Sequence, residues 1–110
     1  MRIAIDYDDT FTADPVAWCK VIQVLEDAGH EVVCVTSRFE TYDNQYNLEA
    51  ALPNSVQVVL CDHNAKAEAM KKRRMPVDIW IDDDPYTIDP DGVTHVCRAC
   101  FIRQSGGSYD

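Results

Sequence analysis

Short apolar runs alternate with longer segments of mixed polarity along this chain. The apolar runs predict buried strands, and they lie at residues 3–5, 32–35, 56–61, 77–81 and 93–97. The segments between them predict helices over residues 15–28, 39–52 and 65–74. Because strands alternate with helices, we expect an α/β domain with a mainly parallel, five-stranded sheet.

Local signals define the ends of these elements. Asp14 followed by Pro15 predicts the start of the first helix, and Gly29 predicts its end. The apolar face of that helix is predicted to consist of Trp18, Val21, Ile22 and Leu25. A turn is predicted at residues 53–55, and the Met75-Pro76 pair ends the third helix.

Length and composition indicate one soluble domain. The chain has 110 residues, of which 46% are hydrophobic and 26% charged. We expect residues 1–103 to form the domain and the Gly/Ser-rich residues 104–110 to be a flexible tail. No apolar run approaches the roughly 20 residues that span a bilayer, and no secretory signal is present, so we expect a cytoplasmic protein without a membrane partner.

Charge and cysteine content narrow the function classes. The net charge of −9 disfavours tight, nonspecific binding of nucleic acid, although local cations or a metal would allow a nucleic-acid end to bind. The five cysteines are odd in number and irregularly spaced, which argues against a secreted disulfide framework. We expect most of them to be small buried side chains.

Chemically active side chains follow three of the predicted strands. Asp6 and Asp8 follow the first, Thr36 ends the second, and Asp82 with Asp83 follows the fourth. In a parallel sheet with right-handed crossovers these strand ends share one edge, where open α/β sheets bind ligands. Converging carboxylates repel each other unless a cation or a proton lies between them, and Mg²⁺ is the natural hard cation for oxygen ligands.

A phosphoryl group suits this combination of residues. A metal and the ammonium of Lys66, which lies in the helix before the fourth strand, would neutralise its oxygens. Thr36 and backbone amides would orient it, and a carboxylate would act as the nucleophile.

These motifs resemble those of the haloacid dehalogenase superfamily of phosphohydrolases. Residues 3–10, IAIDYDDT, are similar to its first motif, an apolar strand followed by Asp-x-Asp-x-Thr. Residues 32–36 resemble the second motif, Lys66 lies where the third is expected, and residues 79–83, IWIDD, resemble the fourth. The resemblance implies a Rossmann-like, three-layer sandwich and a Mg²⁺-dependent phosphatase.

The resemblance also implies roles for individual residues. Asp6 would be the nucleophile that forms an aspartyl-phosphate, and Asp8 would be the general acid and then the base. Lys66 would neutralise the phosphoryl oxygens and tether Asp6, and Thr36 would bind those oxygens. The metal ligands would be a side-chain oxygen of Asp6, the backbone carbonyl of Asp8, Asp82 and, directly or through water, Asp83.

Several assignments have alternatives in the sequence. Lys71 or Lys72 could replace Lys66, although they lie at the far end of the helix. Ser37 could replace Thr36 in binding phosphate, and Arg38 is either a substrate contact or an exposed loop residue. For Asp84, which precedes a proline, we expect a turn with a solvated side chain.

The chain has no room for a cap domain after the first or second motif, so the resemblance is to the minimal, capless type. An open site of that kind takes a bulky substrate or is covered by a second copy of the chain. The resemblance then implies a phosphorylated substrate, and a nucleotide, a nucleic-acid end, a sugar phosphate or a phosphoprotein would each be compatible with the sequence. Tyr42 and Tyr46, one helical turn apart, are candidates for packing, a substrate wall or a subunit contact.

Two other functions fit parts of the pattern. A receiver domain that accepts a phosphoryl group would use Asp62, which follows the third strand. A non-catalytic binding protein on the same fold would lack competent side chains at the catalytic positions, and here every position is filled. Zinc is disfavoured, because the family strand order separates Cys61 and His63 from Cys97 and Cys100.

Overall fold

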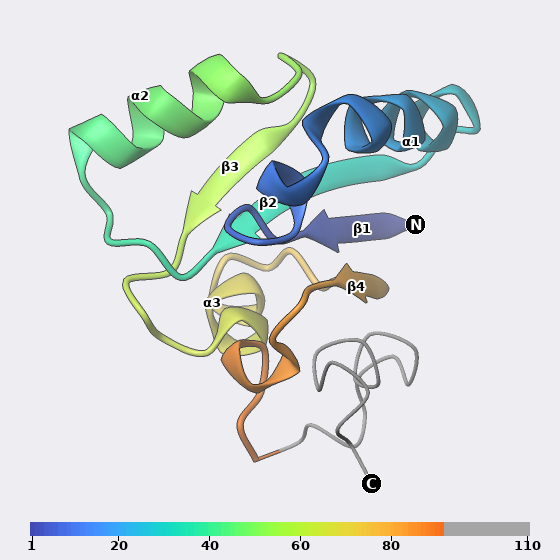
Figure 1. Cartoon of the computed structure of the whole chain (residues 1–110). Helices are drawn as coiled ribbons and strands as arrows, with labels where there is room; N and C mark the ends of the chain where they lie inside the picture. The colour runs from blue at the N-terminus through green and yellow to red at the C-terminus, as the bar shows by residue number, and fades with distance from the viewer. Residues whose placement is uncertain (92–110) are drawn as a thin grey trace, which may run out of the picture.

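The structure, a computed structural model, describes residues 1–91 of the chain. Its centre is a parallel sheet of four strands in the order β3-β2-β1-β4 (Figure 1). The strands are β1 (Arg2–Ile5), β2 (Glu31–Thr36), β3 (Gln57–Leu60) and β4 (Ile79–Ile81). The predicted α/β class and parallel sheet are confirmed. The sheet has four strands within the described residues rather than five, and the strand predicted at 93–97, Cys97, Cys100 and the predicted tail at 104–110 lie outside them.

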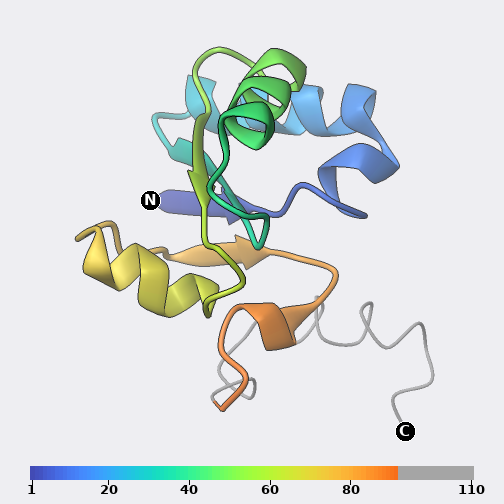
Figure 2. The same ribbon diagram turned by 90° about the vertical axis from the view of Figure 1, so that its left-hand side faces the viewer.

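Helices cover both faces of this sheet. Helices α1 (Pro15–Asp27) and α2 (Tyr42–Ala51) lie on one face, and α3 (Lys66–Lys72) lies on the other (Figures 1 and 2). Two short 3-10 helices, η1 (Phe11–Ala13) and η2 (Pro85–Thr87), follow β1 and β4. Within the described residues, no helix has the length and apolar character needed to cross a membrane.

The strand β2 shows why the predicted strands are continuous apolar runs. Val32 and Cys34 pack in the core under α1 and α2, whereas Val33 and Val35 pack in the core on the α3 side. Successive residues of a strand point to opposite faces, so a strand that is covered on both faces needs apolar residues at every position.

The first helix follows its sequence signals with one exception. The Asp14 carboxylate accepts a hydrogen bond from the backbone N–H of Ala17 at 3.1 Å, and Gly29 has a φ of +90° just after the helix. Such a φ favours glycine because it has no Cβ. The prediction of Val21 on the buried face is wrong, since Val21 is 39% exposed and Cys19 packs against the core instead.

The second helix begins later than predicted. It starts at Tyr42, because the Thr41 hydroxyl caps it by accepting a hydrogen bond from the backbone N–H of Asn44 at 3.1 Å. Residues 38–41 therefore form a loop after β2 rather than part of a helix. Arg38 and Phe39 of this loop line the pocket described below.

The register of the sheet brings the predicted site residues to one edge. Ile5 at the end of β1 pairs with Cys34 of β2 on one side and with Ile81 of β4 on the other. The next residues along β1 and β4, Asp6 and Asp82, therefore leave the sheet side by side. The backbone N–H of Asp6 donates to the carbonyl of Ile81 at 2.9 Å, which fixes this alignment.

Candidate active site

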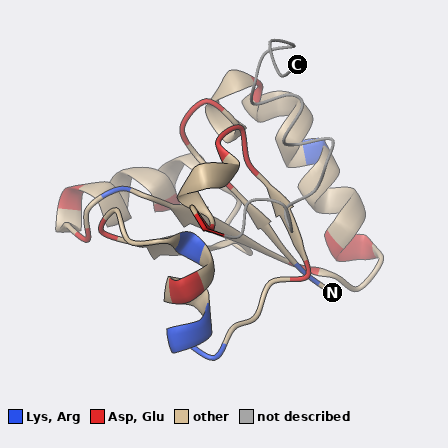
Figure 3. Ribbon diagram, turned by 90° about the horizontal axis from the view of Figure 1, so that it is seen from below, with Lys and Arg blue, Asp and Glu red and all other residues tan. Residues whose placement is uncertain are grey.

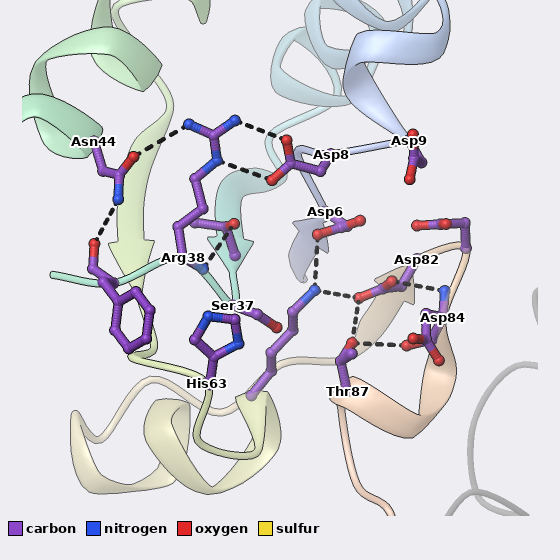
Figure 4. Close-up of a pocket in the computed structure, with 14 residues that line it drawn as sticks. Asp6, Asp8, Asp9, Ser37, Arg38, Asn44, His63, Asp82, Asp84 and Thr87 are labelled. Atoms are coloured by element: carbon purple, nitrogen blue, oxygen red, sulfur yellow. Dashed lines mark hydrogen bonds and ion pairs between the residues drawn. The ribbon is translucent and has the colours of Figure 1, made fainter.

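A pocket of about 330 Å³ lies over this edge of the sheet (Figure 4). Every residue predicted from the sequence to contribute a side chain to the site lines it: Asp6, Asp8, Thr36, Ser37, Arg38, Lys66, Asp82 and Asp83. These residues come from three strand ends and from the first turn of α3. The fold therefore gathers into one cavity the side chains that the sequence separates by up to 77 positions (83 − 6).

Lys66 is at the centre of the buried part of this pocket. Its side chain is 1% exposed, and its Nζ donates hydrogen bonds to Asp6 Oδ1 at 2.8 Å and to Asp82 Oδ2 at 2.6 Å. The alternatives Lys71 and Lys72 are exposed in the last turn of α3. Among the three lysines of this helix, Lys66 is the one that contacts the acids.

Three carboxylates form a candidate cation site beside Lys66. One oxygen each from Asp6, Asp82 and Asp83 lies within 4.8 Å of the others. The hydroxyl of Thr10 is 3.3 Å from Asp6 Oδ2 and 3.0 Å from Asp83 Oδ1, and it accepts a hydrogen bond from the backbone N–H of Asp83 at 3.2 Å. Carboxylate oxygens are ligands for hard divalent cations, so this set fits such an ion.

Burial sets the protonation of the acidic groups. Desolvation raises the pKa of Asp6 from 3.8 to about 7, even though Lys66 acts in the opposite direction. Desolvation also raises the pKa of Asp82, and Lys66 again offsets part of the effect. Burial lowers the pKa of Lys66, but the two carboxylates outweigh it and the net shift is upward. Without a bound cation, the Asp6 carboxyl therefore keeps its proton to a higher pH than an ordinary aspartate does.

Asp8 is held apart from the three carboxylates by Arg38. The guanidinium donates from Nη2 to Asp8 Oδ1 at 2.8 Å and from Nε to Asp8 Oδ2 at 2.9 Å. These hydrogen bonds lower the pKa of Asp8. The side chains of Asp6 and Asp8 therefore do not turn toward one point, although both line the pocket.

Arg38 is itself fixed by further contacts. Its Nη1 donates to Asn44 Oδ1 at 3.2 Å, and its guanidinium carbon lies 5.2 Å from the centre of the Tyr7 ring. Its backbone N–H donates to Thr36 Oγ1 at 3.3 Å. Of the two expectations for Arg38, a substrate contact or an exposed loop residue, its position favours the first, because it lines the pocket.

Some residues of the pocket carry no strong signal in the sequence. Phe39, Asn44, His63 and Thr87 line it, and none follows a strand directly. The Asp-x-Asp-x-Thr motif includes Thr10 but does not indicate that its hydroxyl contacts Asp83. Nothing in the sequence distinguishes Asn44 from the other polar residues on the outward face of its helix.

Four other candidate residues are placed as follows. Asp84 directly precedes the 3-10 turn η2, and its half-buried side chain lines the pocket, while its backbone N–H donates to Asp82 Oδ1 at 2.9 Å. Asp62 is exposed and lines a second cavity rather than this one. Tyr42 and Tyr46 stack on each other at 6.3 Å, and are 81% and 62% exposed, so core packing does not explain them.

Comparisons of this chain with models of protein families, with curated proteins and with solved structures find no match. The function of the pocket is therefore inferred from its own residues. They combine a buried ammonium, three clustered carboxylates, and an acid paired with an arginine at the rim.

Proposed function

We propose that this chain is a Mg²⁺-dependent phosphatase of the haloacid dehalogenase type, on a Rossmann-like fold without a cap domain. It hydrolyses a phosphomonoester through an aspartyl-phosphate on Asp6. The observation that carries this proposal is the position of Lys66, which is buried between Asp6 and Asp82 at the end of the parallel strands. A buried ammonium beside clustered carboxylates suits the binding of a phosphoryl group and a cation.

The donor set supports a divalent cation at this site. Asp6, Asp82 and Asp83 would hold it, since their oxygens already lie within 4.8 Å of one another. When bound, Mg²⁺ supplies positive charge that neutralises the phosphoryl oxygens. Thr10 would keep Asp6 and Asp83 in position for the cation through its hydroxyl group.

The remaining groups suit a two-step transfer. A carboxylate oxygen of Asp6 attacks phosphorus, the bond to the leaving oxygen breaks, and that oxygen takes a proton from Asp8. Water then attacks the phosphorus of the aspartyl-phosphate and gives a proton to Asp8, while the bond between Asp6 and phosphorus breaks and inorganic phosphate leaves. Lys66 and Thr36 would balance and orient the phosphoryl oxygens throughout.

The contact between Arg38 and Asp8 bears on the second step. An ionised Asp8, favoured by Arg38, is ready to accept a proton from water. For the first step Asp8 must carry a proton, so the proposal requires it to leave Arg38 when substrate binds. Arg38 then has a substrate anion as its alternative partner.

The alternative functions have less support. A receiver domain would use Asp62, but β2 separates β3 from β1 in the sheet, and Asp62 does not line the pocket of Asp6. A non-catalytic binding protein has no need for a carboxylate nucleophile next to a buried ammonium. We therefore retain the phosphatase as the single proposed function.

Hydrolysis of p-nitrophenyl phosphate tests the proposal. We expect turnover with Mg²⁺, its loss on addition of EDTA, and its loss in the Asp6→Asn variant. Asp43→Asn, an exposed acid in the first turn of α2, is the matched control and should retain activity. Circular dichroism would establish that each variant is folded. If the folded wild-type protein hydrolyses neither this ester nor nucleoside monophosphates with Mg²⁺, the proposal is wrong.

A further inference from the structure

The pocket has two walls of different chemistry. Asp82, Asp84 and Thr87 lie on one side, and Arg38, Asn44 and His63 lie on the other (Figure 4). The first wall belongs to the proposed cation site. The second wall has no part in holding a cation, so it is available for the part of the substrate that leaves with the ester oxygen.

An exposed aromatic ring forms part of this second wall. Phe39 lines the pocket and its side chain is 58% exposed. Its ring meets the imidazole of His63 edge to face, with the ring centres 4.5 Å apart. Single exposed apolar residues are common on protein surfaces, but this one lies in the wall of the pocket that holds the acids.

The loop that presents Phe39 is fixed before any ligand binds. The side-chain nitrogen of Asn44 donates to the carbonyl of Phe39 at 2.9 Å, while its oxygen accepts from Arg38 Nη1 at 3.2 Å. The N-cap of α2 holds Asn44 through the hydroxyl of Thr41. Binding to a preorganised wall costs less conformational entropy than ordering a mobile loop.

Polar groups lie beside the ring. The guanidinium of Arg38 has five N–H donors, and Asp8 and Asn44 use three of them. The imidazole of His63 adds two ring nitrogens to the same wall. The wall therefore offers an exposed aromatic ring together with hydrogen-bonding groups, among them the guanidinium that pairs with Asp8.

From this geometry we infer that the second wall is a nucleoside subsite, and that the substrate is a nucleoside monophosphate whose base stacks on Phe39. The inference rests on the proposed function and specifies its substrate class. A nucleoside has an aromatic base for Phe39 and sugar hydroxyls and base edges for Arg38 and His63. A sugar phosphate lacks the aromatic face, and an aryl phosphate lacks the polar edges.

Size and charge favour a single nucleotide over a nucleic-acid strand. A volume of about 330 Å³ is at the lower end of the range for small-ligand sites. The chain carries a net charge of −9, and its run of basic residues at positions 71–74, at the end of α3 (Figure 3), does not line the pocket. A long phosphate backbone requires a groove lined by Lys and Arg.

The test compares two nucleotides and one glycerol ester in three forms of the protein. Steady-state hydrolysis of adenosine 5′- and 3′-monophosphate and of glycerol 2-phosphate gives the ratio of kcat/KM for nucleotide to that for glycerol ester. We expect wild type to favour a nucleotide and Phe39→Ala to lower this ratio by roughly tenfold, the usual effect of losing one stacked base. Tyr42→Ala removes a more exposed ring that does not line the pocket, and should keep the wild-type ratio.

Each result decides the question. The nucleoside subsite is overturned if Phe39→Ala leaves the ratio of kcat/KM values unchanged. It is also overturned if Tyr42→Ala lowers that ratio equally. Neither result affects the proposal of a phosphatase. The subsite is likewise overturned, and the phosphatase kept, if the protein hydrolyses p-nitrophenyl phosphate but does not prefer nucleotides to the glycerol ester. If no ester is hydrolysed, the proposed function fails, and calorimetric titration with adenosine decides the subsite. Binding that is weakened by Phe39→Ala supports it, and absence of binding to wild type overturns it.

Discussion

Replacing Lys66 by methionine should destabilise the protein more than replacing any other lysine of α3. Methionine keeps the length of the side chain and fits an apolar environment, so the main loss is the ammonium group. That group is 1% exposed and bonds Asp6 and Asp82 at 2.8 and 2.6 Å. The variant therefore leaves two buried carboxylates without their cation.

The expected loss follows from burial of the unpaired charges. Removing one partner of a buried ion pair costs about 3–5 kcal/mol, because the other charge remains desolvated. Lys66 pairs with two acids, which are 8% and 5% exposed, so the loss should lie near 5 kcal/mol at pH 8. The stability of a small domain is itself about 5–15 kcal/mol. The effect is therefore large enough to measure without ambiguity.

The destabilisation caused by Lys66→Met should become smaller as the pH falls. The pKa of Asp6 is raised from 3.8 to about 7 in the folded protein, so the folded state holds this proton more tightly than the unfolded state does. Stability from that group is present below pH 3.8 and is lost as the pH rises to about 7. In the Lys66→Met variant the carboxylates are harder to ionise, so the variant loses more stability than wild type as the pH rises. The pKa of Lys66 is raised above 10.5, so its own charge is constant over this window.

Urea denaturation at pH 5 and pH 8, in the absence of divalent cations, measures both effects through tryptophan fluorescence. Lys71→Met is the matched control on the same helix, because Lys71 is exposed and should change stability by less than about 0.5 kcal/mol. If Lys66→Met and Lys71→Met unfold at the same urea concentration at pH 8, the buried ion pairs do not stabilise the fold as described. A penalty that is equal at pH 5 and pH 8 would refute the role of carboxylate protonation.

Three further predictions concern the acids of the pocket. Because the pKa of Asp6 is about 7 without a cation, Mg²⁺ affinity should fall as the pH is lowered below 7, and calorimetry in two buffers of different ionisation enthalpy should show proton release on binding. Asp83→Asn should weaken Mg²⁺ binding by about 10–100-fold, and an unchanged affinity in the same titration would remove Asp83 from the site. Arg38→Ala should raise the pKa of Asp8 toward 3.8, as followed by carboxyl NMR. Because the pair is largely exposed, this change should cost no more than about 1 kcal/mol in urea denaturation, and a loss as large as that of Lys66→Met would contradict this.

Periodicity predicted the strands better than it predicted the second helix. The strand β2 is covered on both faces, so the apolar run at residues 32–35 corresponds closely to it. The sequence pattern places Phe39 at the start of the helix predicted over residues 39–52. The capping hydroxyl of Thr41 and the side-chain bond from Asn44 to the carbonyl of Phe39 stabilise a loop there instead. Such bonds depend on where the chain turns, which periodicity does not describe.

The two walls of the pocket differ in the same way: one follows from the strand topology, and the other depends on hydrogen bonds within loops. Asp6, Asp82 and Asp83 could be grouped from the sequence, because strand ends of a parallel sheet meet at one edge whatever the details of the loops. The pairing of Arg38 with Asp8 depends on the path of two loops and on two rotamers, so no spacing in the sequence predicts it. If the proposed assignments hold, the wall set by topology carries the chemistry and the wall set by loops selects the substrate. Substitutions in the loop at residues 38–41 should then change substrate preference while the acids and Lys66 continue to determine whether any ester is hydrolysed.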